Sequence, residues 1–452
     1  MAIIGDAPES ANAPAEPPVD HHDAEAGVST AELVADAGGS VPPEIVGSLR
    51  EYLSAWVRRV RGGDSGALPV FVGLILVIVV FQIENSKYLS ASDIVNLLAY
   101  ASIFVVFGMA EVFALLLSEI DLSVAYVGFV GAMIVAELMG SPFFWPWWAA
   151  IIIGLLATAV IGAIQGTIIT RLHIPSFVVT LAGLLGWEGF LIFVTDLDHA
   201  AVGGVMSIPP TNVLYHLIYG QMSPTWGWIV LGVMVVVFGG YMLVRDARRR
   251  SAGLSAPPLS ITLVTVAVTA VAGVLLVLVC NTNRGTTVVI VRGVPYFVPY
   301  VVLIFLVWTV VVGRTRFGRY VYAIGANPEA ARRAGINVAL VRTAAFMLCS
   351  FTAGLAGLLY ESRQGSMGID VTGGTYVLLA VAAAVIGGTS LFGGRGKPLH
   401  AVLGGLMIAA IYGGLALLAV SADGTYMSIA LVLLAAATVD TLVRRRGSAT
   451  QL

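Results

Sequence analysis

Twelve predominantly apolar stretches alternate with short polar segments between residues 68 and 443. About 20 apolar residues are enough to cross a bilayer as a helix, and most of these stretches approach that length. The pattern therefore predicts an all-α fold, a polytopic transmembrane helix bundle with about twelve spans. The predicted spans are Leu68–Ile83, Ile94–Leu117, Val124–Met139, Trp147–Thr170, Phe177–Thr195, Thr225–Val244, Leu259–Cys280, Pro295–Gly313, Thr343–Glu361, Tyr376–Phe392, His400–Val420 and Tyr426–Val443. An even number of spans places both termini on the same side of the membrane.

Composition agrees with a membrane protein and excludes a soluble one. Hydrophobic residues make up 58% of the chain and charged residues 11%, with a mean hydropathy of +0.92. The cysteines, Cys280 and Cys349, lie within or at the edge of apolar runs, so we expect them to serve packing and predict neither a disulfide framework nor a metal site. Gly394–Lys397 resembles a phosphate-binding loop only superficially, because Leu391 replaces its first glycine and Pro398 follows its lysine. Without such a loop or a hydrolase motif, we expect neither an enzyme nor a cofactor bound by this chain.

Charge is distributed unevenly along the chain. Residues 1–49 contain nine acidic residues and no Lys or Arg, and this tail is predicted to be disordered. The rest of the chain retains 17 of the 26 acidic residues and all 24 basic ones, including a basic juxtamembrane segment at 50–67. With a cytoplasmic N-terminus, twenty basic residues fall inside and four fall outside, which is a strong positive-inside bias. We therefore expect cytoplasmic termini, with 444–452 as a C-terminal tail and 314–342 as a cytoplasmic loop in a transmembrane domain at 68–443.

The longest polar interruption of the second half, Arg314–Arg342, contains a predicted short helix at Pro328–Ala334. Its signals, in chain order, are a capping Asn327, Pro328 at the first helical position, acidic Glu329, basic Arg332 and Arg333, and a left-handed stop at Gly335. The small residues Ala330, Ala331 and Ala334 would permit close contact with a partner, and Ala331 is expected on the contact face. The alternative is an ordinary amphipathic loop helix between two spans.

Ionisable residues inside the predicted spans are costly enough to suggest function: Glu111, Glu137, Glu188 and the pair Glu119 and Asp121. The last pair interrupts an apolar run. A half-helix that begins near Asp121 or Ser123 would direct its N-terminal N–H groups into the bundle. For Asp121 two roles stay open, a structural cap or a gating or pathway residue.

Uncharged polar side chains are better suited to a sugar, because they can exchange hydrogen bonds with its hydroxyls without holding them tightly. The candidates are Asn96, Gln165, Thr167, Thr180 and Gln364. For each of them, hydrogen bonding between helices is the alternative. Small residues at helix-packing spacing, such as Gly162 and Gly166, predict close helix crossings.

Four segments together resemble one known family: Gly318–Val338, Ile120–Val124, Ile174–Leu185 and Ala382–Gly396. They are similar to the sugar permeases of ATP-binding-cassette importers, the ribose/xylose permease family, in which the first segment is the cytoplasmic coupling loop. The resemblance covers roughly 68–442, and the longer central segment makes the xylose-type permeases the closest. This chain has Glu119 and Ala125 where family members usually carry glycines around the Ile-Asp-Leu-Ser-Val motif.

The resemblance implies a permease with a core of ten spans plus an extra pair, in the plasma (inner) membrane of a prokaryote. A separate ATPase subunit would use the ATP, and an extracytoplasmic binding protein would deliver a xylose- or ribose-like monosaccharide. A second permease copy and membrane lipid are the other expected partners, and nucleic acid is not expected. The ATPase would dock on Asn327, Pro328, Glu329, Ala330, Ala331, Arg332 and Gly335. The alternative function is a proton-coupled secondary transporter that uses Glu111 or Glu188.

Overall fold

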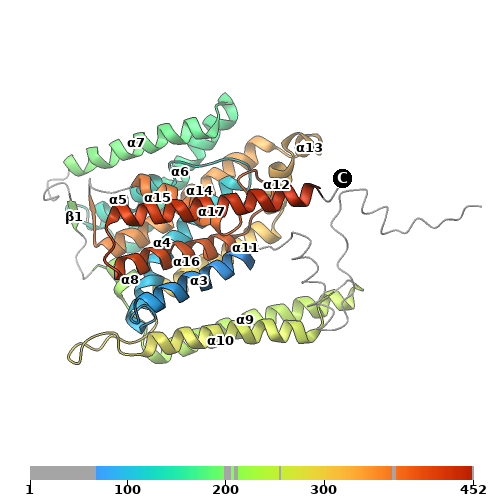
Figure 1. Cartoon of the computed structure of the whole chain (residues 1–452). Helices are drawn as coiled ribbons and strands as arrows, with labels where there is room; N and C mark the ends of the chain where they lie inside the picture. The colour runs from blue at the N-terminus through green and yellow to red at the C-terminus, as the bar shows by residue number, and fades with distance from the viewer. Residues whose placement is uncertain (1–67, 198–204, 208–211, 254–255, 369–372, 450–452) are drawn as a thin grey trace, which may run out of the picture.

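The computed structural model describes residues 68–197, 205–207, 212–253, 256–368 and 373–449. The predicted acidic tail at 1–49 and the basic segment at 50–67 lie outside the described residues. Within them the chain is almost entirely helical (Figure 1). The long and intermediate helices are α3 (Leu68–Glu84), α4 (Ala91–Leu115), α5 (Val124–Met139), α6 (Trp147–Leu172), α7 (Ser176–Leu197), α9 (Pro224–Ser251), α10 (Leu259–Asn281), α11 (Phe297–Arg314), α12 (Arg316–Ala326), α14 (Val338–Gln364), α15 (Gly373–Ile386), α16 (Pro398–Leu417) and α17 (Ala422–Ala449).

Eight helices of the described part are long and apolar enough to cross a membrane, namely α4, α6, α7, α9, α10, α11, α14 and α16. Four shorter apolar helices, α3, α5, α15 and the apolar part of α17, accompany them. Each of the twelve predicted apolar stretches coincides with one of these helices, so the polytopic helical bundle is confirmed. The boundary of α17 extends beyond the predicted span, since the helix continues to Ala449.

Two short strands depart from the all-α expectation. Strand β1 (Val205–Ser207) pairs antiparallel with β2 (Ser366–Gly368), with Val205 opposite Gly368. The first strand follows α7 and the second follows α14, so the ladder joins two distant parts of the chain. Two very short helices complete the described elements, α8 (Tyr215–Tyr219) and α13 (Pro328–Arg333).

Helix α14 forms the centre of the bundle and packs against α4, α5 and α6. Helix α4 is buried on nearly all sides, because α15 and α16 cover the face that α14 leaves free. In Figure 1, α7 runs along one side of this core and the α9–α10 pair along the opposite side. The apolar residues of these three helices are mostly exposed, as expected for helices that face lipid.

The predicted close crossing at Gly162 and Gly166 is confirmed. A Cβ at Gly162 would overlap the Phe346 carbonyl oxygen of α14, and one at Gly166 would lie 2.7 Å from the Thr343 Cα. Only glycine allows α6 to approach α14 this closely. Such a close approach lets the two helices contact each other in place of lipid. By contrast, α15 ends at Ile386 and not at the predicted Phe392, because the chain turns away there.

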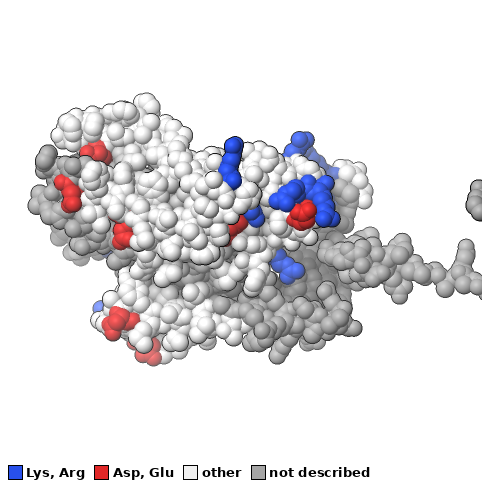
Figure 2. All heavy atoms as spheres, turned by 90° about the horizontal axis from the view of Figure 1, so that it is seen from above, with Lys and Arg blue, Asp and Glu red and all other residues white. Residues whose placement is uncertain are grey.

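Charged side chains separate toward the two ends of the bundle. Figure 2 shows Lys and Arg gathered toward the end at which α12 and α13 lie, and most of the visible Asp and Glu toward the other end. A broad uncharged zone lies between them on the face shown. This distribution has the form that the positive-inside bias of the sequence predicts.

Candidate functional site

The predicted short helix exists as α13, and its capping signals act as expected. The Ala330 N–H donates to Oδ1 of Asn327 at 2.9 Å, and Pro328 occupies the first helical position. At the other end, Gly335 adopts a left-handed conformation with φ of +81° and its N–H donates to the Arg332 carbonyl at 3.0 Å. Both ends of this short helix are therefore fixed by hydrogen bonds.

The inward face of α13 differs from the expectation. The side chain of Ala331 is only 4% exposed, because α13 lies against α12 and α14 and turns this residue into the main core. Placing Ala331 on the contact face was wrong. The exposed surface of α13 consists of Pro328, Glu329, Ala330, Arg332 and Arg333.

On that exposed surface, Glu329 pairs with two arginines of its own helix. The distances are 2.8 Å from Arg332 Nη1 to Oε2 and 3.3 Å from Arg333 Nε to Oε1. Such exposed pairs are worth only ~0.2–0.5 kcal/mol each, so they leave the three charges free to exchange partners. Ala330, between them, is the small residue that the surface presents.

Helix α12 connects α13 to the interior of the bundle. The backbone of Gly325 lies against the Leu116 carbonyl oxygen, where a Cβ would overlap it. The same carbonyl accepts a hydrogen bond of 2.9 Å from the Gly394 N–H, and the Tyr322 hydroxyl donates to the Gly396 carbonyl at 2.6 Å. Three chain segments thus meet here: α12, the end of α4, and the turn at 387–397 between α15 and α16.

The interruption between α4 and α5 is organised by Asp121. Its Oδ1 accepts hydrogen bonds from the Ser123 N–H at 2.9 Å and the Ser123 hydroxyl at 2.6 Å, just before α5 begins. The Gln165 amide donates to the Ser123 hydroxyl at 2.9 Å, and the Cys349 thiol lies 3.6 Å from Oδ2 of Asp121. Oε1 of Glu111 accepts from the Asp121 N–H at 3.2 Å. We call Glu111, Asp121, Ser123, Gln165 and Cys349 the inner polar cluster.

Several polar atoms at the inner polar cluster have no partner among the described residues. They are Oε2 of Glu111, Oε1 of Gln165 and the nearby Ser350 hydroxyl. The Asp121 and Glu111 side chains are completely buried, and the described residues contain no group of three or more potential ligands placed to hold a metal ion. The hydrogen bonds of Asp121 hold the turn before α5 and reach no N–H group of the helix itself, so both its cap role and its gating role stay predictions.

Thr180 also reaches this region, since its hydroxyl lies 3.3 Å from the Ile120 carbonyl. Thr167 does not: its hydroxyl donates to the Ala163 carbonyl of its own helix, on an exposed face of α6. The structure therefore brings Asp121, Gln165 and Thr180 together and leaves Thr167 apart.

Asn96 and Gln364 form a second group at the opposite end of the bundle. Asn96 lies ~22 Å along α4 from Glu111 at 1.5 Å per residue. Its Oδ1 accepts a hydrogen bond of 2.7 Å from Arg363, the residue before the exposed Gln364. Sequence reasoning missed Arg363 because the predicted span ended at Glu361, whereas α14 continues to Gln364. Glu361, the last residue of that predicted span, was also missed, and neither of its buried carboxylate oxygens has a partner among the described residues.

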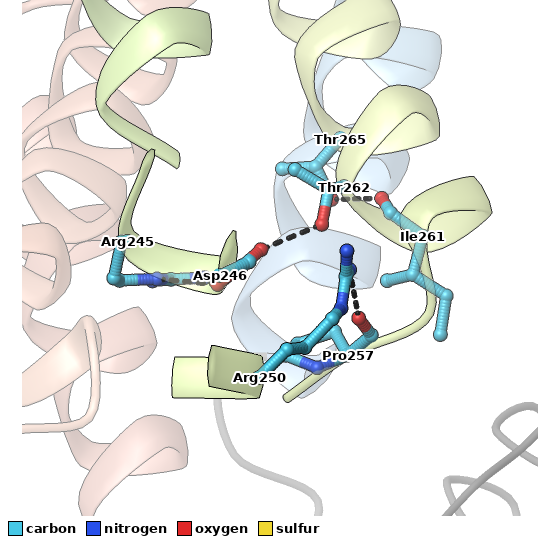
Figure 3. Close-up of polar contacts among 7 residues, drawn as sticks. All are labelled: Arg245, Asp246, Arg250, Pro257, Ile261, Thr262 and Thr265. Carbon is cyan, nitrogen blue, oxygen red and sulfur yellow. Dashed lines mark hydrogen bonds and ion pairs between the residues drawn. The ribbon is translucent and has the colours of Figure 1, made fainter. Parts of the chain in front are cut away.

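A separate set of contacts holds the end of the α9–α10 pair at which α9 finishes and α10 begins (Figure 3). Buried Asp246 accepts from Arg245 Nε at 2.7 Å and from the Thr262 hydroxyl at 2.7 Å, while Arg250 donates to the Pro257 carbonyl at 2.8 Å. Part of the basic run at 245–250 thus joins α9 to α10.

The described part of the chain is thus a bundle of apolar helices with a capped surface helix tied to an interruption inside the bundle, an arrangement that suits a membrane permease subunit. The chain belongs to the family described as branched-chain amino acid transport system / permease component, whose model matches residues 93–437. No solved structure matches the chain.

Relatives of known name extend over most of the chain. The xylose transport system permease protein XylH of Escherichia coli (strain K12) is 32% identical over 395 residues, which cover 85% of this chain and 96% of that protein. The fructose import permease protein FrcC of Rhizobium meliloti is 28% identical over 380 residues, covering 84% and 86%. The ribose import permease protein RbsC of Escherichia coli (strain K12) is 25% identical over 402 residues, covering 88% and 98%.

Proposed function

We propose that this chain is the membrane-spanning subunit of an ATP-binding-cassette importer that carries a monosaccharide inward. The observation that supports it most is α13, a rigidly capped helix with an exposed face and a direct connection through α12 to the interrupted α4–α5 region. A force applied to α13 by a soluble ATPase would reach the interior of the bundle through these contacts. Relatives named as xylose, fructose and ribose permeases support a simple sugar as substrate.

The proposal includes the arrangement in the membrane. All twelve apolar helices cross or enter the inner membrane of a prokaryotic cell, with α13 and both termini in the cytoplasm. The separation of charge in Figure 2 supports this orientation. An extracytoplasmic binding protein delivers the sugar on the opposite side, and two copies of the chain assemble with the ATPase subunits.

The competing function is a proton-coupled transporter. Membership in a family of permease components, together with the exposed α13, favours the ATP-driven mechanism. In addition, Oε1 of Glu111 is engaged by the Asp121 N–H, which gives this carboxyl a role in holding the chain at the interruption.

The decisive experiment places a bulky residue on the exposed face of α13. Ala330→Trp should insert normally and leave the bundle intact, yet abolish co-purification of the ATPase and reduce ATP-driven uptake of xylose, ribose or fructose to background. Ala330→Ser is the matched control, since it keeps the size of the side chain. Normal uptake by Ala330→Trp, with the ATPase still bound, would remove α13 from the mechanism.

A further inference from the structure

A second group of unusual side chains lies at the end of the bundle opposite α13. It combines one arginine, one amide and four tyrosines from α4, α14, α15 and α16. We call it the outer aromatic cluster, and its members are Asn96, Tyr100, Tyr360, Arg363, Tyr376 and Tyr412.

The rings of the cluster contact one another across helices. The Arg363 guanidinium lies over the Tyr100 ring, 4.4 Å from its centroid, and Tyr100 contacts Tyr412 with centroids 5.1 Å apart. Tyr360 and Tyr376 lie 4.9 Å apart in an edge-to-face arrangement. Phe104 joins the two pairs, at 6.1 Å from Tyr412 and 5.9 Å from Tyr376. The cluster is therefore a continuous set of aromatic contacts with a guanidinium at one edge, in which Tyr100, Tyr376 and Tyr412 are partly exposed and Phe104 and Tyr360 are buried beneath them.

Arg363 keeps most of its hydrogen-bonding capacity. Among the described residues its side chain donates only to Asn96 and has no carboxylate partner. Other partly buried arginines are engaged differently: Arg342 lies 3.4 Å from Glu119, and Arg284 donates to Gln221 and to two backbone carbonyls. A guanidinium has five N–H donors, so Arg363 retains donors for an external group.

Three tyrosine hydroxyls of the cluster likewise keep their hydrogen-bonding capacity among the described residues. Tyr88, Tyr300 and Tyr322 each donate to a backbone carbonyl, so their hydroxyls are used inside the protein. No such partner is found within the described chain for the hydroxyls of Tyr100, Tyr376 and Tyr412, whose side chains are half-buried. A half-buried phenol without an internal partner presents both a ring face and a hydroxyl to a ligand.

We propose that the outer aromatic cluster is a monosaccharide-binding site, reached from the extracytoplasmic side. The C–H face of a sugar ring packs on the tyrosine rings, while Arg363 and Asn96 exchange hydrogen bonds with neighbouring hydroxyls. Aromatic surfaces with a few fixed polar groups are typical of small-molecule sites. The site rests on the proposed import function and specifies where the sugar first contacts this subunit.

The alternative for these residues is purely structural, with Arg363 and Asn96 joining α14 to α4. The two roles predict different effects of substitutions on the sugar preference of the transporter. A structural defect lowers transport of every sugar alike, whereas loss of a sugar contact changes the ratio between sugars that differ in hydroxyl geometry.

The first test measures kcat/KM for xylose, ribose and fructose in vesicles that contain the complete transporter and its binding protein. Arg363→Gln should lower the value for the preferred sugar by roughly 10- to 100-fold, the effect of losing a hydrogen bond to a charged donor. The values of kcat/KM for the other two sugars should fall less, so the ratio of kcat/KM between the sugars shifts. Tyr412→Phe should shift this ratio less than Tyr412→Leu, because phenylalanine keeps the aromatic ring. Equal losses for all three sugars would overturn the proposal.

A second test works even if Arg363→Gln does not reach the membrane. Cys280 and Cys349 are completely buried, so a cysteine introduced at exposed Gln364 reports alone to a membrane-impermeant thiol reagent. The sugar that the wild-type complex transports should slow labelling of Gln364→Cys at least threefold and leave the control Lys87→Cys unchanged. If the sugar leaves labelling of Gln364→Cys unchanged while uptake continues, the proposed site is refuted. Wild-type vesicles without any ATP-driven uptake of a monosaccharide would instead refute the proposed function.

Discussion

Replacing Gly325 with alanine tests the connection between α13 and the interior of the bundle. The added Cβ would overlap the Leu116 carbonyl oxygen and lie 2.6 Å from the Gly394 nitrogen. Neither atom can move away as a flexible side chain would, because both belong to the backbone. The substitution must therefore separate α12 from the end of α4, and it leaves the exposed face of α13 unchanged.

The size of the effect follows from three contributions. Overpacking of a tight contact costs about 1–3 kcal/mol. Loss of the hydrogen bond between Gly394 and Leu116 costs about 1 kcal/mol more. Alanine regains about 1 kcal/mol relative to glycine in a helix interior. The net destabilisation is thus about 1–3 kcal/mol, concentrated at this contact.

Two measurements on the purified complex check this expectation: the apparent Tm and the amount of sugar imported per ATP hydrolysed. Gly325→Ala should lower both, since the ATPase still docks but its motion reaches the interruption less effectively. Gly313→Ala is the matched control, because a Cβ there meets no atom within 4 Å. If Gly325→Ala and Gly313→Ala both behave like the wild type, this contact neither stabilises the fold nor transmits motion.

Three further outcomes are expected. Thr262→Val removes the hydroxyl donor to buried Asp246 and should lower stability by about 1–3 kcal/mol, seen as a lower Tm than that of Thr265→Val, whose hydroxyl bonds only within its own helix. Deletion of residues 1–45 should leave uptake unchanged at equal membrane levels, and a loss would reveal a regulatory segment. A protonophore should leave uptake intact in the wild type and in Glu111→Gln, and uptake that follows the proton gradient would support the secondary-transporter function.

The sequence was sufficient for features that depend on local chemistry. Apolar length alone located the eight helices of the described part that are long enough to cross a membrane and the four shorter apolar ones, and the capping residues Asn327 and Gly335 located α13 nearly to the residue. In each case the signal and the structure lie within one stretch of chain.

Features that depend on distant neighbours were not accessible in this way. Helix α13 has six residues, too few for a hydrophobic period, so nothing local distinguished the buried Ala331 from the exposed Ala330. The contact of Cys349 with Asp121 joins residues 228 positions apart, and the stacking of Arg363 on Tyr100 likewise requires the folded chain.

The α9–α10 pair has a consequence for engineering of this protein. Apolar contacts around Val277 and Cys280 hold one end of the pair, and toward its other end the Arg314 guanidinium of α11 lies over the Tyr241 ring, 4.8 Å from the ring centroid. These two helices pack mainly against each other and most of their apolar side chains are exposed, so a change in side-chain volume there creates no cavity in the core. The α9–α10 pair lies on the other side of the bundle from α13 (Figure 1), so the segment between these two helices is a suitable place to insert a reporter domain or an affinity tag.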